Sequence, residues 1–510
     1  MAFRPRRSVS GDRPTRRPAR GAARLLGVGA AGLLAAACTM PPATPQGSSS
    51  RTPYLVPTAA DVSSVAILST GDSVNPKPDG TPYRLTGIPD GLGAYDNGDG
   101  TFTVLMNHEH NNTQGVTRAH GAKGSYVSKW IVEKDTLKVR SGADLIQGIA
   151  TWNTTTGTWN APAAGVVLNR LCSGDLPAAS ALFDGASGLG TTEKIFFSGE
   201  ESGAEGRGFA HVVTGAAAGT SYELPHLGNF SFENIVLRPD SGTTTIAAGL
   251  DDTTPGEVYF YKGTKTSDAN PVVAAGLANG VLGGIAVQGL AAETDTNAPV
   301  GAVPFTLPDL GDVSGLTGAQ LQTASTAAGI TKFNRPEDGA WDPSNPNVFY
   351  FVTTASFTSI SRLWRLTFVD GANPSLGGTA EVMYESPAND PSLAPADQAG
   401  PRMMDNITVT PSGDVLIQED PGNQPYVAGI WQYDPGTDQI RKVLVHDPAR
   451  FAVGAPGFVT QDEESSGIIP LQDITGANNY LVDVQSHATS SDPELVEDGQ
   501  LLSVNIPPFG

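Results

Sequence analysis

Cysteine and charge are both scarce in this chain. Among its 510 residues there are two Cys, Cys38 and Cys172, and charged residues make up 16%, below the roughly 25% of average soluble proteins. Because only Cys172 lies outside the N-terminal segment, no internal disulfide can stabilise the body of the protein. No run approaches 18 apolar residues, so we expect no transmembrane helix.

Several catalytic signatures are also absent. The sequence contains no Gly-x-Ser-x-Gly elbow, no Walker loop, no dinucleotide fingerprint and no Cys-x-x-Cys pair. Serine esterases, P-loop nucleotidases and Rossmann dehydrogenases therefore lack their usual markers here.

Positive charge is rare as well, and most of the imbalance lies in the body of the chain. Residues 1–38 hold eight Arg and one Asp, so the remainder carries 23 basic against 51 acidic residues. Such a surface repels nucleic acids and anionic lipids, and we expect no nucleic-acid partner. It favours cations.

The N-terminal 38 residues have the pattern of an export signal. Arg-rich residues 1–24 precede a short apolar stretch, Leu25–Ala37, which is too short to span a bilayer. Thr15-Arg16-Arg17 resembles a twin-arginine signal; general secretion remains the alternative. We expect an exported protein in the cell envelope, periplasm or extracellular space.

The end of this segment, Ala35-Ala36-Ala37-Cys38, resembles a lipoprotein processing site, so the expected contact with a membrane is a lipid anchor at Cys38. An ordinary thiol beside an Ala-x-Ala cleavage site is the alternative. Residues 39–60, rich in Thr, Pro and Ser, are expected to form a flexible linker. Residues 61–510 are expected to form a single domain.

The sequence of that domain predicts a repeated β structure. Gly (60) and Pro (39) are abundant, and six units share a turn, an apolar strand with polar or acidic residues at its end, a loop and a second strand. The strand pairs are 101–106 with 126–132, 194–198 with 209–213, 244–248 with 258–261, 348–352 with 363–368, 415–418 with 430–433, and 480–484 with 501–504.

Six such units predict an all-β, six-bladed β-propeller-like fold with long insertions and a few short helices. One insertion, Ser314–Ile330, is expected to be helical, with Ser314 and Thr317 as candidate N-caps. Another large β protein built from hairpins is the alternative.

In a propeller, equivalent strand ends meet at one mouth of the central channel. The polar strand ends are then expected to be neighbours: Glu109, Glu200, Glu201, Asp252, Glu419, Asp420 and His487. Carboxylates that crowd together resist ionisation unless a cation lies among them. Oxygen-rich clusters select hard ions such as Ca²⁺, Mg²⁺ or Mn²⁺.

Two strand ends carry candidate ligands. In Asn107-His108-Glu109-His110 we expect Glu109 to be an oxygen ligand, with zinc on His108 and His110 as the alternative. The Gly-rich run from Phe197 to Arg207 contains three acids and an Arg, and a solvated acidic turn is the alternative there.

Two further motifs open the fourth and fifth units. In Asn334-Arg335-Pro336-Glu337-Asp338-Gly339, an Arg and a Glu flank a rigid Pro and could serve a phosphate and a metal ion. An Arg–Glu ion pair closing a turn is the alternative. Asp405 and Asn406 offer oxygens of the kind that calcium prefers, or else form an Asx turn.

Together these motifs resemble the PhoX-type alkaline phosphatases. The residues that carry the resemblance are Asn107-His108-Glu109, Gly199-Glu200-Glu201, Arg335 to Gly339, Asp405-Asn406 and Val482 to His487. The likeness spans roughly residues 60–505. It implies export, a six-bladed propeller-like fold, and hydrolysis of phosphomonoesters with calcium together with iron.

Carried over residue by residue, the resemblance implies metal binding by Glu200, Glu337, Asp405 and Asn406, with Glu109, Glu201 and Asp90 as further candidate ligands. It implies phosphate binding by Arg335, with Arg362, Arg365 and Arg207 as additional candidates. The family's iron-binding Cys, expected shortly before Asn107, is missing from residues 87–91. Cys172 is the substitute candidate, with a buried structural role as the alternative, so the expectation is firmer for several Ca²⁺ ions than for Fe³⁺.

The sequence thus leads to the hypothesis of a monomeric, exported metallophosphatase for small phosphorylated substrates. A metal-activated water would attack phosphorus, Arg335 would neutralise charge, and Glu109 or His108 would assist the leaving group. A phytase, a phosphodiesterase or a lactonase-like calcium propeller is one alternative. A non-catalytic binding propeller with structural calcium is another.

Overall fold

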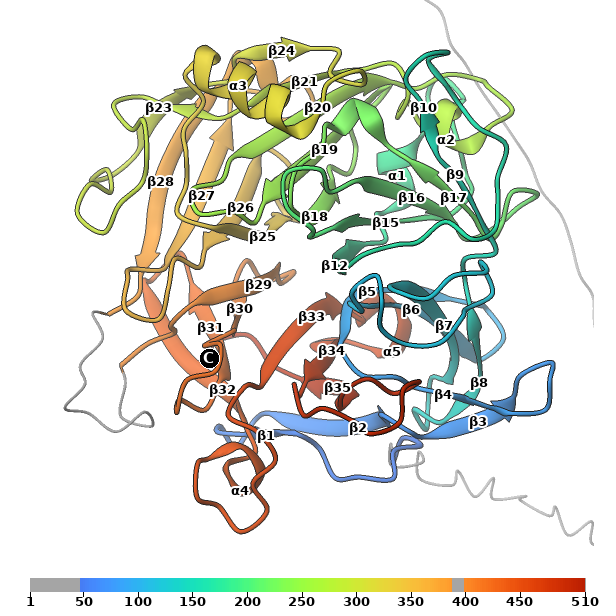
Figure 1. Ribbon diagram of the computed structural model, residues 1–510. Helices are drawn as coiled ribbons and strands as arrows, with labels where there is room; N and C mark the ends of the chain where they lie inside the picture. Colours follow the sequence, from blue (N-terminus) through green and yellow to red (C-terminus); the bar gives the residue numbers. More distant parts are fainter. Residues whose placement is uncertain (1–45, 388–398, 510) are drawn as a thin grey trace, which may run out of the picture. The chain divides into compact units, whose positions relative to one another are not determined.

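The six predicted strand pairs form the centres of six separate sheets. The computed structural model describes residues 46–387 and 399–509, which belong to one unit, Ala43–Gly510. The expected pairs appear as β6–β7, β15–β16, β19–β20, β26–β27, β30–β31 and β34–β35, all antiparallel. The sheets lie around a common centre as the blades of a propeller (Figure 1). The predicted all-β six-bladed fold is confirmed.

We number the blades along the chain and give their strands from the centre outward. Blade 1 contains β5 (Pro89–Asp96), β6 (Thr101–His108), β7 (Tyr126–Glu133) and β8 (Val139–Asp144). Blade 2 contains β12 (Leu171–Asp175), β15 (Ile195–Glu200), β16 (Gly208–Val212), β17 (Thr220–Glu223) and β9 (Gly148–Ala150). Blade 3 contains β18 (Phe232–Leu237), β19 (Thr244–Asp251), β20 (Val258–Thr264), β21 (Val281–Gly284) and β24 (Asp309–Gly311).

The second half of the ring uses N-terminal strands as well. Blade 4 contains β25 (Pro336–Trp341), β26 (Val348–Thr353), β27 (Arg362–Phe368), β28 (Gly378–Glu385), β23 (Val303–Thr306) and β22 (Ala286–Val287). Blade 5 contains β29 (Met404–Val409), β30 (Val415–Glu419), β31 (Gly429–Asp434), β32 (Gln439–His446) and β1 (Leu55–Pro57). Blade 6 contains β33 (Glu464–Pro470), β34 (Asn479–Gln485), β35 (Gly499–Asn505) and β2 (Ser63–Ser69).

The remaining elements are short. Three small hairpins are β3 (Ser73–Pro76) with β4 (Pro82–Arg84), β10 (Trp152–Asn153) with β11 (Thr158–Trp159), and β13 (Phe183–Asp184) with β14 (Leu189–Gly190). The short helices are α1 (Ala179–Leu182), α2 (Pro271–Ala274), α4 (Pro448–Phe451), α5 (Gln472–Thr475), η1 (Pro225–Leu227) and η2 (Pro374–Leu376). In the described part of the chain, no helix has the length and apolar character needed to cross a bilayer.

The predicted helical insertion is α3 (Gly318–Ala328). Thr317 caps it, because its side chain accepts from the backbone N–H of Gln320 while the Gln320 side chain accepts from the Thr317 backbone, a capping box. Gly329 ends it in the left-handed conformation. Thr317 is therefore the N-cap; Ser314, the other candidate, lies outside the helix.

The hydrophobic core lies between the blades. Each of the six apolar clusters joins two neighbouring blades, so the ring is closed by burial on both faces of every sheet. Phe196 and Phe197 show how one strand supplies both faces: Phe196 packs toward blade 1 and Phe197 toward blade 3. Successive side chains of a strand point to opposite faces, which is why these strands read as continuous apolar runs.

Part of the expected linker belongs to the fold. Residues 39–60 were expected to be flexible, yet Leu55–Pro57 form β1 and pair with β32, and Tyr54 and Leu55 are fully buried. The expectation was wrong there because these apolar side chains complete the cluster between blades 5 and 6. The expected export signal and Cys38 lie outside the described residues.

Because β2 closes blade 6 with N-terminal residues, its core side chains should strongly affect stability. Leu68 is fully buried in the cluster between blades 6 and 1, while Ser63 at the start of β2 is exposed. We expect Leu68→Ala to lower the free energy of unfolding by about 2–5 kcal/mol and Ser63→Ala to change it by less than about 0.5 kcal/mol. Urea titration measures both; equal effects would contradict this role of β2.

Candidate active site

A ring of six inner strands surrounds the central channel. The strands β5, β12, β18, β25, β29 and β33 contact one another in that order, and β33 contacts β5 to close the ring. In every blade the register between the inner strand and its neighbour shifts near the start of the inner strand. Two inner-strand residues there face one residue of the partner strand, which is a β-bulge. Bulges redirect side chains.

The first residue of each bulge supplies the chemistry of the channel. These residues are Asp90, Cys172, Glu233, Glu337, Asp405 and Ser466. All except Ser466 line one cavity of about 360 Å³. The same backbone irregularity, repeated around the ring, thus gathers four carboxylates and a thiol from five blades.

The second bulge residues form a hydrogen-bonded floor. Asn234 donates to Asp338 at 2.6 Å, Asn406 donates to Ser173 at 2.6 Å, and the Ser173 hydroxyl donates to Glu233 at 2.6 Å. In blades 1 and 6 this position is Gly; a Cβ at Gly91 would lie 2.3 Å from the backbone nitrogen of Gly174. A side chain at Gly91 would collide with the neighbouring strand, so this position requires glycine.

A second tier of acids comes from the ends of the neighbouring strands. Glu109, Glu201, Asp252 and Asp420 each follow the last residue of the second strand in their blades, and all line the cavity together with His487. The expected convergence of these five strand ends on one mouth of the channel is confirmed. The expectation was wrong for Glu200 and Glu419.

Strand alternation explains both corrections. Glu200 is four residues after Phe196 on β15, so both side chains point to the same face of the sheet, toward blade 1. There Glu200 forms an ion pair with Arg207 at 2.7 Å. Glu419, fully buried, accepts hydrogen bonds from the backbone of Arg402 and the Tyr426 hydroxyl. The residues that face the channel are the next ones along, Glu201 and Asp420.

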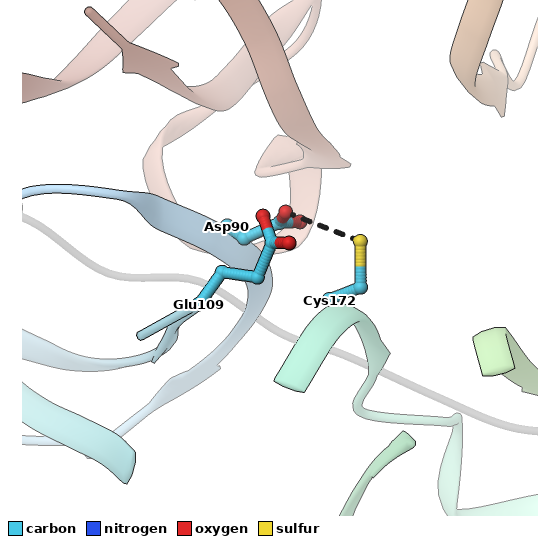
Figure 2. A group of neighbouring side chains, drawn as sticks. All are labelled: Asp90, Glu109 and Cys172. Carbon is cyan, nitrogen blue, oxygen red and sulfur yellow. Dashed lines mark hydrogen bonds between the residues drawn. The ribbon is translucent and has the colours of Figure 1, made fainter. Parts of the chain in front are cut away.

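Three groups of side chains have donor atoms within 4.8 Å of one another, close enough to share a metal ion. They are Asp90–Glu109–Cys172, Glu233–Glu337–Asp405 and Asp405–Asp420–Glu464. Figure 2 shows the first group, in which the Cys172 thiol lies 3.4 Å from Asp90. The thiol also donates to Glu233 at 3.1 Å. Cys172 therefore contacts carboxylates of blades 1 and 3, although it is far along the sequence from the Asn107–Glu109 motif.

The charges of this cavity favour bound cations. Among the described residues it is lined by eleven carboxylates and two Arg side chains. Burial, and then the neighbouring carboxylates, raise the pKa values of Asp90 and Asp405 well above the usual Asp range. The same causes raise the pKa of Glu233 to about 7. Only bound cations would let such a group stay ionised at neutral pH, so the donor set fits several metal ions.

The two Arg side chains are held by one backbone device. Arg170 and Arg335 each directly precede an inner strand and adopt the left-handed conformation, with φ of 51° and 66°. Non-glycine residues rarely take this conformation, and the strain it carries is typical of functional sites. Ile88 and Met403 take the same conformation before β5 and β29.

Carboxylates orient both guanidinium groups. The Nε of Arg335 lies 2.8 Å from both Asp252 and Glu337, and its terminal nitrogens have no other partner among the described residues. Arg170 pairs with Glu109 at 2.6 Å and with Glu201. Since the two carboxylates bind Nε, the terminal nitrogens of Arg335 are available to bind an anion in the cavity.

The other predicted Arg residues have structural partners. Arg362 is fully buried and pairs with Glu293 at 2.8 Å and with Glu385 at 2.7 Å. Arg365 pairs with Glu381 at 2.5 Å, and Arg207 pairs with Glu200. None of the three lines the cavity, and their assignment as substrate-binding residues is corrected.

His108 is also corrected. It lies on the same face of β6 as Val104 and Met106, fully buried, with Nδ1 against the Thr86 hydroxyl and Nε2 against Ser128, each at 2.9 Å. Burial lowers its pKa well below 6.5, so the ring is neutral and away from the cavity. The remaining predicted residues, Asp90, Glu109, Cys172, Glu201, Arg335, Glu337, Asp405 and Asn406, all line it.

Sequence reasoning missed Arg170, Glu233 and Glu464 in the site, and two of the three left signals in the sequence. Asn169-Arg170-Leu171-Cys172 repeats the pattern of Asn334-Arg335-Pro336-Glu337, which would have pointed to Arg170. Glu233-Asn234 repeats Asp405-Asn406. Glu464 gave no comparable signal, because three adjacent acids occur at 462–464 and the sequence does not show which of them line the cavity.

Comparison with known proteins agrees with the fold. Residues 208–432 match the model of the family "Alkaline phosphatase PhoX". Pseudomonas fluorescens PhoX, solved in complex with vanadate, a transition state analogue, has a similar structure at 14% sequence identity, with a TM-score of 0.58 over 90% of this chain and 97% of that one. No curated protein sequence matches the chain.

Two sialidases are more distant. NanB from Streptococcus pneumoniae covers 85% of this chain and 70% of its own at 9% identity and a TM-score of 0.37. The Trypanosoma rangeli sialidase covers 88% and 58% at 10% identity and a TM-score of 0.35. At these scores neither bears on the site. The family-model match over residues 208–432 and the shared fold confirm the resemblance to the PhoX-type alkaline phosphatases found in the sequence, and they support a phosphatase as the enzyme class.

Proposed function

We propose that this chain is an exported, metal-dependent phosphatase that hydrolyses phosphate monoesters by attack of a metal-activated water. The observation that carries the proposal is the six-fold ring of bulges, which places three groups of metal donors beside Arg335 in one cavity. The cavity, about 360 Å³, suits a small phosphorylated substrate. The vanadate bound by the related Pseudomonas protein is consistent with phosphoryl chemistry at such a site.

The donor chemistry suggests which metal each group would hold. Glu233, Glu337, Asp405, Asp420 and Glu464 offer only carboxylate oxygens, which suit Ca²⁺. Asp90, Glu109 and Cys172 form a mixed oxygen–sulfur set, which suits a transition metal such as iron. When bound, such ions lower the pKa of a coordinated water and neutralise phosphate oxygens.

The chain's own residues would bind and orient the substrate. The terminal nitrogens of Arg335, with Nε fixed by Asp252 and Glu337, would hold two phosphate oxygens. Arg170, on the other side of blade 3, would add positive charge near Glu109. The floor of Ser173, Asn234, Asp338 and Asn406 would fix the ligand side chains. Such pre-organisation accounts for most of the rate gain in phosphoryl transfer.

Export and a lipid anchor at Cys38 belong to the same proposal and rest on the sequence of residues 1–38, which lie outside the described part; a monomeric state is proposed with them. The strongly acidic body of the chain attracts cations and repels polyanions, which argues against nucleic acid as a partner.

Arg335 should carry much of the transition-state stabilisation. We expect Arg335→Ala to lower kcat/KM for a chromogenic phosphomonoester by about 10²–10³-fold, whereas Arg365→Ala, whose side chain pairs with Glu381 outside the cavity, should stay within about twofold. Steady-state kinetics with metal-loaded protein tests this. Loss of equal size in both variants would contradict the role of Arg335.

Cys172 should determine metal content selectively. We expect Cys172→Ser to lose most of the bound iron, because a hydroxyl is a poor ligand for a transition metal compared with a thiolate, while calcium stays near its wild-type content. Elemental analysis of both purified proteins gives the answer. Unchanged iron in the variant would exclude the thiol as a ligand.

Metal-free protein should lose stability as pH rises. The folded-state pKa of Glu233 is raised from 4.5 to about 7, so its contribution is complete below pH 4.5 and is lost as pH rises through 7. A shift of this size amounts to about 3 kcal/mol, and we expect Tm in chelator to fall by several degrees between pH 5 and pH 8. In calcium the fall should be absent. Equal pH profiles with and without calcium would count against a metal site.

A further inference from the structure

His487 is the one imidazole that lines the cavity within the described residues. It follows the end of β34 and lies on blade 6, with its side chain 29% exposed. Its Nδ1 is 2.8 Å from the Glu497 carboxylate, in the segment that leads into β35. Nε2 has no partner among the described residues, so one nitrogen is fixed and the other is available in the cavity.

Three other groups that could be considered as proton donors are engaged elsewhere. His108 is buried and neutral, with both nitrogens engaged. Glu109 is held by Arg170 and by the side-chain amide of Gln485. Glu337 raises the pKa of Arg335 still further above its usual range, so the guanidinium does not give up a proton. A phosphomonoester with a basic alcohol as leaving group nevertheless needs a proton on its ester oxygen.

We propose that His487 is the general acid that protonates the leaving group, positioned by Glu497; this inference rests on the proposed phosphatase function. As the oxygen of water bonds to phosphorus and one of its protons passes to solvent, the bond between phosphorus and the ester oxygen breaks. The electron pair of that bond passes to the ester oxygen, which takes the proton from Nε2. The neutral imidazole regains a proton from solvent after the alcohol leaves.

The arrangement of charges supports this role. Arg170 and Arg335 lie on blades 2 and 4, while His487 lies on blade 6, so the phosphate anchors and the proton donor come from different parts of the ring. Burial by itself lowers the pKa of His487. The hydrogen bond and charge of Glu497, together with the charges of Glu109 and Asp462, outweigh burial and raise the pKa overall. The imidazole thus stays protonated to higher pH than a free histidine.

The dependence of rate on the leaving group tests the proposal. Metal-loaded wild type and His487→Asn are compared on 4-nitrophenyl phosphate, phenyl phosphate and an alkyl phosphate, with release of inorganic phosphate as the common readout. Because a poor leaving group needs the acid most, we expect kcat/KM of the variant to fall by about 10²–10³-fold on the alkyl ester and by less than about tenfold on the nitrophenyl ester.

His226→Asn is the matched control, since His226 also pairs with a carboxylate, Asp312 at 3.0 Å, but lies outside the cavity. It should leave all three rates near wild type. A loss in His487→Asn that is equal for the three esters, or no loss, would overturn the assignment. Failure of wild type to cleave any ester would instead refute the proposed function itself.

Glu497→Gln separates positioning from catalysis. Removing the carboxylate charge lowers the pKa of His487, so the basic limb of the pH profile of kcat/KM on the alkyl ester should move to lower pH. At pH values well below the basic limb, where the imidazole is protonated in both proteins, the rate of the variant should approach that of wild type. A profile that keeps its wild-type limb would overturn the role given to Glu497.

Discussion

The structure depends on holding carboxylates together against their mutual repulsion. Eleven acidic side chains line one cavity with two Arg side chains among the described residues, and burial makes each ionised group more costly. The opposing free energy comes from the six apolar clusters between blades, which fix the inner strands whatever the charge state of the channel. Bound cations would offset this repulsion, and three groups of side chains have donor atoms close enough to share a metal ion.

Two backbone irregularities convert a regular propeller into a specific site. The bulge at the start of each inner strand redirects one side chain into the channel, and a left-handed residue precedes four of the six inner strands. In blades 2 and 4 that residue is Arg. Both devices cost local backbone energy, and both are tolerated because the surrounding sheet pairing over-determines the conformation. The placement of acid, thiol and guanidinium groups is therefore a property of the fold.

Much of the site could be predicted once the repeats were found. Glu109 was identified because it ends an apolar strand, and Glu337 and Asp405 because they lie in motifs that open two of the units and resemble the PhoX-type family; all three line the cavity. The errors at the strand ends have a common origin. Glu200 and Glu201 were both expected at the mouth of the channel, although only one of two neighbouring side chains can face it. Strand parity decides between neighbours, and parity is fixed by a register that a one-residue bulge reverses. The expectation of a flexible linker over residues 39–60 was wrong for another reason: Tyr54 and Leu55 are buried against strands almost 400 residues away in the sequence.

The sequence by itself determined the six strand pairs, the all-β class and the acidic character of the channel, because periodicity, turn residues and charge are local or compositional properties. Only the tertiary structure decided that Cys172 joins Asp90 and Glu109, that Arg170 flanks the site with Arg335, and that His487 rather than His108 faces the cavity. These outcomes depend on which residues the closed ring brings together, and ring closure is set by packing between blades distant in sequence.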